Sequence, residues 1–254
     1  MLWNSKPIFI MKTNQIIITL IAGLSIIVFG LILSGAYKYK FKSTNTINVT
    51  GNAKKDFESD LVKWTATYSR KSMQLSEASD LLTRDREVVR NFLIKQGIKA
   101  DEIQFDAVSI TKDFVYSSDE NGRSYNQFSG YSLSQNVSVE SKNLEKVDAA
   151  SREISTLISQ GLELSSNTPN YYYSKLEDLK LELISQASSN ARQRAGNIAK
   201  EAGSSLGDLV KADLGIFQIT GQNDNEEYSY GGAFNTTSRS KTANITVKTS
   251  YLAD

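Results

Sequence analysis

An uncharged stretch of 21 residues, from Ile16 to Ala36, limits what this chain can become more than any other feature. As an α-helix it would measure about 32 Å, which matches the roughly 30 Å hydrocarbon core of a bilayer. Lys12 precedes the stretch and three lysines follow it within residues 37–42, where their ammonium groups reach the lipid headgroups. The sequence therefore predicts a membrane-spanning helix over 16–36, with residues 1–15 as a cytoplasmic n-region.

This segment has two interpretations, an uncleaved anchor and a cleaved signal peptide. Ser34, Gly35 and Ala36 supply the small residues that a cleavage site requires. The apolar run exceeds the about 7 to 15 residues of a signal-peptide core, which favours the anchor. A buried core helix is the least favoured alternative, because an all-round apolar helix at a chain terminus has no evident partner.

The flanking charges leave open the side of the membrane on which the rest of the chain lies. Two lysines precede the segment and three follow it, which slightly favours a cytoplasmic domain. The free amino terminus nearly cancels that difference, and the small residues at 34–36 favour export.

Charge and composition exclude several classes of function. Five of the 29 basic residues and none of the 28 acidic residues lie before Ser43, so the rest of the chain has 24 basic and 28 acidic residues. This part would repel a phosphate backbone, which makes nucleic-acid binding unfavourable. The chain contains no Cys and no His, which excludes disulfides, thiol nucleophiles, imidazole acid–base chemistry and Cys/His zinc sites.

Hydrophobic periodicity predicts an α+β domain behind a basic tether at residues 37–45. Helical spacing of apolar residues predicts three helices, at about 74–96, 144–160 and 175–202. The apolar face of the last helix narrows from Leu to Ala, so we expect it to pack closely on a sheet or another helix. Alternating apolar residues predict strands at 46–51, 61–70, 103–116, 128–140, 162–164, 209–219 and 243–251.

Three irregular stretches interrupt these elements. The apolar phase slips between Phe105 and Val108, which predicts a β-bulge. The polar residues 117–127 predict a turn that joins the flanking strands as a hairpin. Residues 220–239 form a Gly-, Asn- and Ser-rich insertion, and a loop of that length is usually either mobile or used for interaction.

Four segments carry patterns that go beyond periodicity. TINVTGNA begins at Thr46, Gly130-Tyr131 precedes the strand VSVE, NARQRAGNIAKEAGSSLGDLVK runs from Asn190 to Lys211, and NITVKTSYL closes the domain. They resemble the TIxVxGxG, GYxAxxxVxV, AxxKAxxLAxxxGxxLGxV and closing-strand segments of the SIMPL-domain family, also called DUF541. The chain departs from that family at residues 59–62, where Ser-Asp-Leu-Val replaces Pro-Asp-x-Ala and places the turn into the second strand in doubt.

The resemblance implies one SIMPL domain over residues 46–251. It implies an α+β fold, in which an antiparallel or mixed sheet packs with three helices. It also implies a location in the periplasm or at the surface of a bacterial envelope, assembly into large rings in some members, and a link to stress tolerance. It implies no catalytic activity, because the family brings no established active site.

Chemically capable side chains form no recognisable reaction centre in the sequence. The acidic groups Asp101-Glu102, Asp119-Glu120 and Asp224 to Glu227 lack EF-hand spacing and are interpreted as solvated loop charges. Tyr171-Tyr172-Tyr173 is interpreted as packing in preference to an exposed aromatic patch. Four N-x-[ST] matches, at Asn48, Asn136, Asn235 and Asn244, are interpreted as chance. We therefore assign no catalytic, cofactor-binding or metal-binding residue.

These observations favour a non-enzymatic protein that is tethered to a membrane through Ile16 to Ala36 and acts by assembly or interaction in the cell envelope. A homo-oligomer is expected, and an envelope protein is a further candidate partner. Two alternatives remain. One is a small-ligand binder or enzyme that uses carboxylate, Tyr or Lys groups in a pocket, and the other is an adaptor that faces the cytoplasm.

Overall fold

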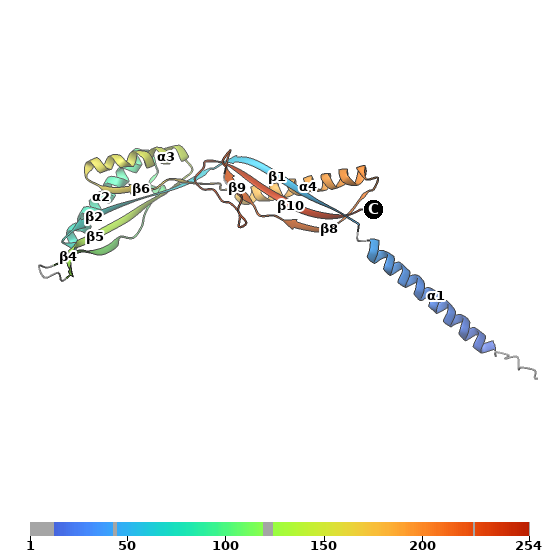
Figure 1. Ribbon diagram of the computed structural model, residues 1–254. Helices are drawn as coiled ribbons and strands as arrows, with labels where there is room; N and C mark the ends of the chain where they lie inside the picture. The colour runs from blue at the N-terminus through green and yellow to red at the C-terminus, as the bar shows by residue number, and fades with distance from the viewer. Residues whose placement is uncertain (1–12, 43–44, 119–123, 226, 254) are drawn as a thin grey trace, which may run out of the picture. The chain divides into compact units, whose positions relative to one another are not determined.

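The computed structural model describes residues 13–42, 45–118, 124–225 and 227–253 (Figure 1). These residues form an α+β structure of helices and antiparallel sheets, as the sequence predicts. They divide into two compact units. The first unit contains described residues of Met1–Gly51, Ser189–Asp213 and Lys248–Asp254, and the second contains those of Asn52–Ser188 and Leu214–Val247.

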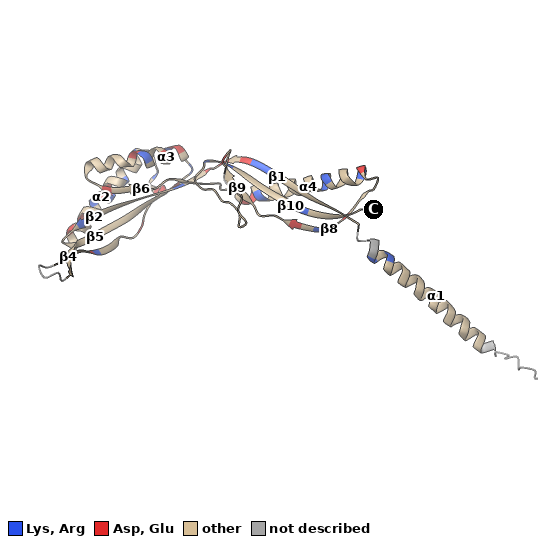
Figure 2. Ribbon diagram, viewed as in Figure 1, with Lys and Arg blue, Asp and Glu red and all other residues tan. Residues whose placement is uncertain are grey.

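The N-terminal helix α1 spans Thr13–Lys42. Its stretch from Gln15 to Lys40 is long and apolar enough to cross a membrane, and Figure 2 shows basic residues near its C-terminal end alone. The helix includes the predicted span of 16–36 and continues through residues 37–42, which the sequence predicts as tether. Neither Gly nor Pro lies between Ala36 and Lys42, so nothing in that stretch terminates the helix.

A six-stranded sheet lies in the second unit. Its order is β3-β5-β2-β6, with β4 also paired to β5 and β7 also paired to β2. Each of these pairs is antiparallel. The strands are β2 (Leu61–Ser72), β3 (Ile103–Phe105), β4 (Ser109–Ser118), β5 (Ser124–Ser141), β6 (Glu163–Ser166) and β7 (Asn170–Tyr172).

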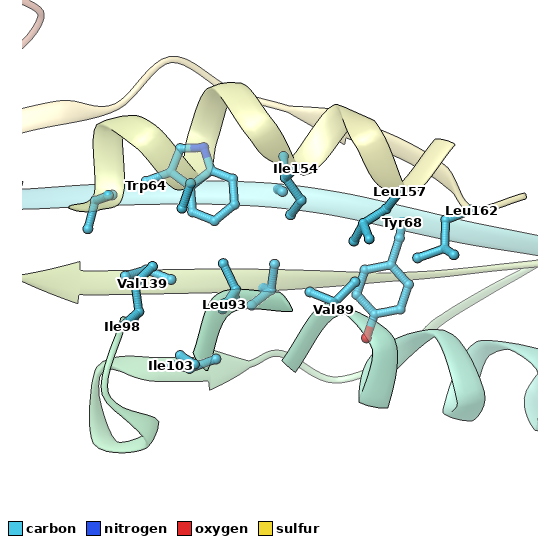
Figure 3. Close-up of a cluster of buried hydrophobic side chains, with 14 of the residues drawn as sticks. Trp64, Tyr68, Val89, Leu93, Ile98, Ile103, Val139, Ile154, Leu157 and Leu162 are labelled. Atoms are coloured by element: carbon cyan, nitrogen blue, oxygen red, sulfur yellow. The ribbon is translucent and has the colours of Figure 1, made fainter. Parts of the chain in front are cut away.

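One face of this sheet carries the main hydrophobic core. Opposite residues of an antiparallel pair share a face, so the apolar side chains of β2 lie beside those of β5. The helices α2 (Leu75–Lys95) and α3 (Leu144–Glu153) and the 3-10 helix η2 (Ile154–Gln160) contribute the other half of the core (Figure 3). The largest fully buried side chains here include Trp64, Tyr68, Leu93, Leu133 and Ile154.

The predicted bulge lies between β3 and β4. Phe105 is opposite Val137 and Ser109 is opposite Ser134. Between these two pairs the chain from β3 to β4 advances by four residues, while β5 advances by three. The extra residue confirms the bulge expected after Phe105. It also corrects the predicted single strand 103–116, because the ladder is interrupted at the bulge and two strands result.

A second register shift shapes the outer part of the β4–β5 hairpin. Asp113 lies opposite Gly130, but the next residue, Phe114, lies opposite Phe128, so β5 carries one extra residue. Gly130 has a φ of 125°, a region that favours glycine. A Cβ at this position would also lie 2.8 Å from the backbone oxygen of Ser72. Conformation and close approach both require glycine here.

The other sheet has the order β1-β10-β8, with β9 also paired to β10. Within the second unit, Leu179 and Leu183 of α4 cluster with Ile245 of β10. Within the first unit, Ala191 and Ala195 of the same helix are buried, so the predicted packing role of its apolar face is confirmed. The elements are β1 (Thr46–Glu58), α4 (Leu176–Glu201), β8 (Leu206–Leu214), β9 (Gln218–Gly221) and β10 (Ser240–Ala253).

The predicted strand 209–219 is wrong as a single element, because it breaks into β8 and β9 at Gly215. The N–H of Gly215 donates to the carbonyl of Thr246 at 2.8 Å. A Cβ at this position would lie 2.5 Å from Oγ1 of Thr246, so glycine permits a close backbone approach at the break. The predicted helix 144–160 likewise changes from α to 3-10 geometry at Ile154.

The turn between β1 and β2 consists of Ser59 and Asp60, where the sequence departs from the family pattern. The N–H of Asp60 donates to the carbonyl of Tyr172 at 3.0 Å. The carboxylate of Asp60 accepts hydrogen bonds from the N–H and hydroxyl of Ser174, at 2.7 and 2.6 Å. Side-chain and backbone hydrogen bonds thus fix this turn without proline, and the chain passes from one sheet to the other.

Hydrogen bonds hold the described part of the insertion 220–239. The N–H of Ile219 donates to the carbonyl of Ala233, and the N–H of Asn235 donates back to the carbonyl of Ile219, both at 2.8 Å. The buried ammonium of Lys241 donates to the carbonyl of Asn235 at 2.8 Å and also contacts the carbonyl of Ser238. The insertion is therefore packed against β9 and β10.

Candidate functional site

The outer edge of β4, Ser109–Ser118, exposes more large apolar side chains than its neighbouring strands do. We call it the β4 edge. In the described part of the chain, β4 pairs with β5 alone, so its other side has no strand partner. The exposed fractions are 57% for Ile110, 56% for Phe114, 53% for Val115 and 72% for Tyr116.

Both faces of the β4 edge are apolar. Successive residues of a strand point to opposite faces, so Phe114 and Tyr116 share one face and Val115 lies on the other. The ring of Phe114 lies 5.9 Å from that of Phe128, which lies 5.1 Å from that of Tyr131. These edge-to-face contacts form a row of rings that ends at the β4 edge. Exposed apolar groups gathered in this way mark an interaction site.

A charged cavity of about 620 Å³ is the second candidate site. It lies in the second unit, where the β1–β2 turn meets the N-terminus of α3. Four cationic side chains line it against three carboxylates. The charged lining residues are Lys99, Lys142, Lys146, Arg239, Asp60, Glu102 and Glu145.

The chain itself engages the carboxylates of this cavity. Burial acts to raise the pKa of Asp60, but the hydrogen bonds from Ser174 outweigh it and hold that pKa below its ordinary value. Glu102 accepts hydrogen bonds from the hydroxyl of Ser141 at 2.8 Å and from the N–H of Lys99 at 3.0 Å. These two carboxylates therefore stabilise local turns. The buried hydroxyl of Ser59, at the cavity wall, has no hydrogen-bond partner among the described residues.

A polar network lies between α2 and the sheet. The hydroxyl of Tyr68 donates to the side-chain oxygen of Gln135, whose amide donates to the carbonyl of Asp106 at 2.6 Å. The side chain of Gln135 thus hydrogen-bonds the backbone of the bulge between β3 and β4. Arg70 forms a two-pronged ion pair with the buried carboxylate of Asp85, with Nη2 at 2.9 Å from Oδ1. Burial raises the pKa of Tyr68, so this hydroxyl stays protonated as a donor.

Two arginines of α2 stack on one ring. The guanidinium carbons of Arg86 and Arg90 lie 4.8 and 5.2 Å from the ring centroid of Phe105. Like charges four residues apart destabilise a helix, and the ring offsets part of that repulsion. We find no ion pair for either arginine in the described residues.

The three consecutive tyrosines are partly buried, as the packing interpretation predicts. The ring of Tyr171 packs against the main core, and its hydroxyl donates to the carboxylate of Asp148 at 2.7 Å. The ring of Tyr173 lies 5.0 Å from that of Phe57. Burial, and then the hydrogen bond to Asp148, raise the pKa of Tyr171 to about 12.

These raised pKa values predict a loss of stability at alkaline pH. Tyrosine ionises near pH 10 in the unfolded chain, whereas Tyr171 keeps its proton to about pH 12 when folded. In that interval the unfolded state binds fewer protons, so the free energy of unfolding falls as pH rises. Denaturant unfolding of the full chain in detergent, followed by tryptophan fluorescence, would measure the slope. Tyr171→Phe should reduce the slope, and an unchanged slope would contradict the assignment.

The structure separates the acidic groups that the sequence analysis considered. Glu102 is engaged as described above, and Asp224 accepts a hydrogen bond from the N–H of Asn225 at 2.8 Å. Asp119, Glu120 and Glu226 lie outside the described residues. Across residues 13–42, 45–118, 124–225 and 227–253, no three His, Cys, Asp or Glu side chains gather as a metal site would require. The N-x-[ST] residues Asn48, Asn136, Asn235 and Asn244 all form side-chain hydrogen bonds.

Sequence reasoning missed the β4 edge and the charged cavity. A signal for the edge existed, because Phe114, Val115 and Tyr116 are consecutive and cannot all face one core. The cavity had no such signal, since its charged residues come from four separate stretches of the chain.

Comparison with known proteins identifies a family. No curated protein matches the chain. The model of the SIMPL family, described as "Protein of unknown function (DUF541)", matches residues 47–251. That range includes every strand of the two sheets apart from the first residue of β1 and the last two of β10. The chain therefore belongs to the SIMPL family.

Proposed function

We propose that this SIMPL-family protein is a membrane-tethered, non-catalytic module that self-associates in the cell envelope. The N-terminal apolar helix supplies a segment compatible with membrane anchoring. The exposed apolar side chains of the β4 edge are the observation that carries the proposal, because such groups are usually covered by a partner.

Tethering favours association between copies of the same chain. Molecules anchored in one membrane move in two dimensions, which raises their effective concentration relative to free solution. A weak edge contact is then sufficient to hold copies together. The charged cavity supports a ligand-binding role less well, because its carboxylates Asp60 and Glu102 already serve local turns.

Association of the full chain in its membrane tests this proposal. We expect most copies to be captured in complexes when native membranes are treated with an amine-reactive crosslinker, since the domain surface carries many lysines. Extraction into nanodiscs and mass photometry should then find more than one copy per disc. One copy per disc, together with no crosslinked species, would contradict self-association.

We further propose that the domain faces the periplasm or the exterior. The family resemblance and the small residues at 34–36 support export. A phosphatase that is active outside the cytoplasm, fused to the C-terminus of the full chain, should be active in cells. An inactive phosphatase and a fluorescent cytoplasmic reporter at the same position would favour the adaptor that faces the cytoplasm.

A further inference from the structure

The β4 edge can be assigned a partner more specifically. We propose that two copies of this chain join their β4 edges as antiparallel strands around a two-fold axis at Phe114. This inference rests on the self-association proposed above and names the surface that makes it. The two six-stranded sheets would become continuous across the contact.

The β4 edge lacks two of the features that usually protect an exposed edge strand, namely proline and a very short length. Natural edges are protected by proline, very short strands, charged side chains or bulges. Here the strand has ten residues and contains no proline. One of its two charged residues, Asp113, already pairs with Lys71 at 2.8 Å. Lys112 is then the one charge of the strand without a salt bridge in the described residues.

Charge excludes two registers of the pairing. Consider a two-fold axis that is perpendicular to the sheet and passes beside one residue of the strand. A residue that lies a given number of positions before that central residue in one copy is then opposite the residue that lies the same number of positions after it in the other copy. An axis at Lys112 or Asp113 would therefore bring two like charges directly opposite, which is unfavourable. An axis at Phe114 avoids both contacts. It also places Lys112 opposite Tyr116 of the second copy, where a cation–π contact is possible.

The aromatic row supports the same centre. The rings of Tyr131, Phe128 and Phe114 follow one another across the hairpin at 5.1 and 5.9 Å and end at Phe114. In the Phe114-centred pair, the ring of Phe114 meets its own copy, so the row continues from one molecule into the next. On the other face of the sheet, Val115 of one copy would lie opposite Asp113 of the second copy. The methyl groups of Val115 would pack against the β4 strand of that second copy.

The absence of cysteine from the chain makes this register directly testable. In the Phe114→Cys variant of the full chain, each new thiol would face its own copy across an antiparallel pair. Opposite Cα atoms in such a pair are about 4.5–5.5 Å apart, which suits a disulfide. In the control Ile110→Cys, each thiol would face Ser118 of the second copy. We expect mild oxidation in membranes to crosslink the first variant at least about tenfold faster than the control.

A second variant keeps the test independent of the aromatic ring itself. Val115→Glu would place a carboxylate directly opposite Asp113 of the second copy and should weaken self-association about tenfold, whereas Leu181→Glu on the exposed side of α4 should not. Equal crosslinking of the two cysteine variants, or unchanged association of Val115→Glu, would overturn the proposed edge pairing while self-association stands. A chain that does not associate at all would overturn the proposed function as well.

Discussion

Replacement of Trp64 by alanine is expected to lower the free energy of unfolding by about 3–5 kcal/mol. The side chain is 1% exposed and lies in the core between the sheet and the two covering helices (Figure 3). Its indole N–H donates to the hydroxyl of Ser166 at 3.1 Å and to the carbonyl of Asn167 at 3.0 Å. Truncation would therefore leave a cavity and also remove a donor from two acceptors.

Denaturant unfolding of the full chain in detergent, followed by far-ultraviolet circular dichroism, would measure this loss. Lys63→Ala is the matched control on the neighbouring position of β2. The ammonium of Lys63 forms a largely exposed ion pair with Glu140 at 2.9 Å, and such pairs contribute roughly 0–1 kcal/mol. A loss for Trp64→Ala no greater than that of the control would show that the core does not depend on the indole.

The face that each element buries could be predicted from the sequence. Val62, Trp64, Ala66 and Tyr68 alternate along β2, and all four are buried in the main core. Such a pattern is local, because a strand in which one face meets a core and the other meets water must repeat every two residues. The apolar face of α4 was predictable for the same reason, at the helical period.

Strand pairing could not be predicted in this way. β1 and β2 are separated by two residues, yet β1 pairs with β10 and β2 pairs with β5. Periodicity reports which face is buried and carries no information about the neighbouring strand. The pairing depends on contacts between residues far apart in the sequence, such as Tyr68 and Gln135. The division of the strands into two sheets therefore required the structure.

The β4 edge could not be predicted from the sequence for a related reason. Consecutive apolar residues such as Phe114, Val115 and Tyr116 usually indicate a strand that is covered on both faces. In this chain they remain exposed, because β4 lies at the end of the sheet. Whether a strand is central or at an edge is a property of the whole sheet. The sequence of the strand therefore indicates that it needs cover, and the structure shows that the described chain does not supply it.

Gly130→Ala is expected to cost roughly 3 kcal/mol of unfolding free energy, from backbone strain and a steric clash together. The residue has a φ of 125°, and its new Cβ would lie 2.8 Å from the backbone oxygen of Ser72. Because β2 and β5 pair along most of their length, this clash cannot be relieved without shifting the central ladder.

Gly161→Ala is the matched control, because it introduces backbone strain without a steric clash. Gly161 also has a positive φ, 86°, but a Cβ there would meet no atom within 4 Å, so its substitution should cost about 1 kcal/mol. The difference between the two variants, measured by denaturant unfolding of the full chain, reports the close approach of Gly130 to Ser72 together with the greater backbone strain at a φ of 125°. Equal losses would mean that β5 moves away from Ser72 at little cost. In that case the glycine of the Gly-Tyr segment would be required for its backbone conformation alone.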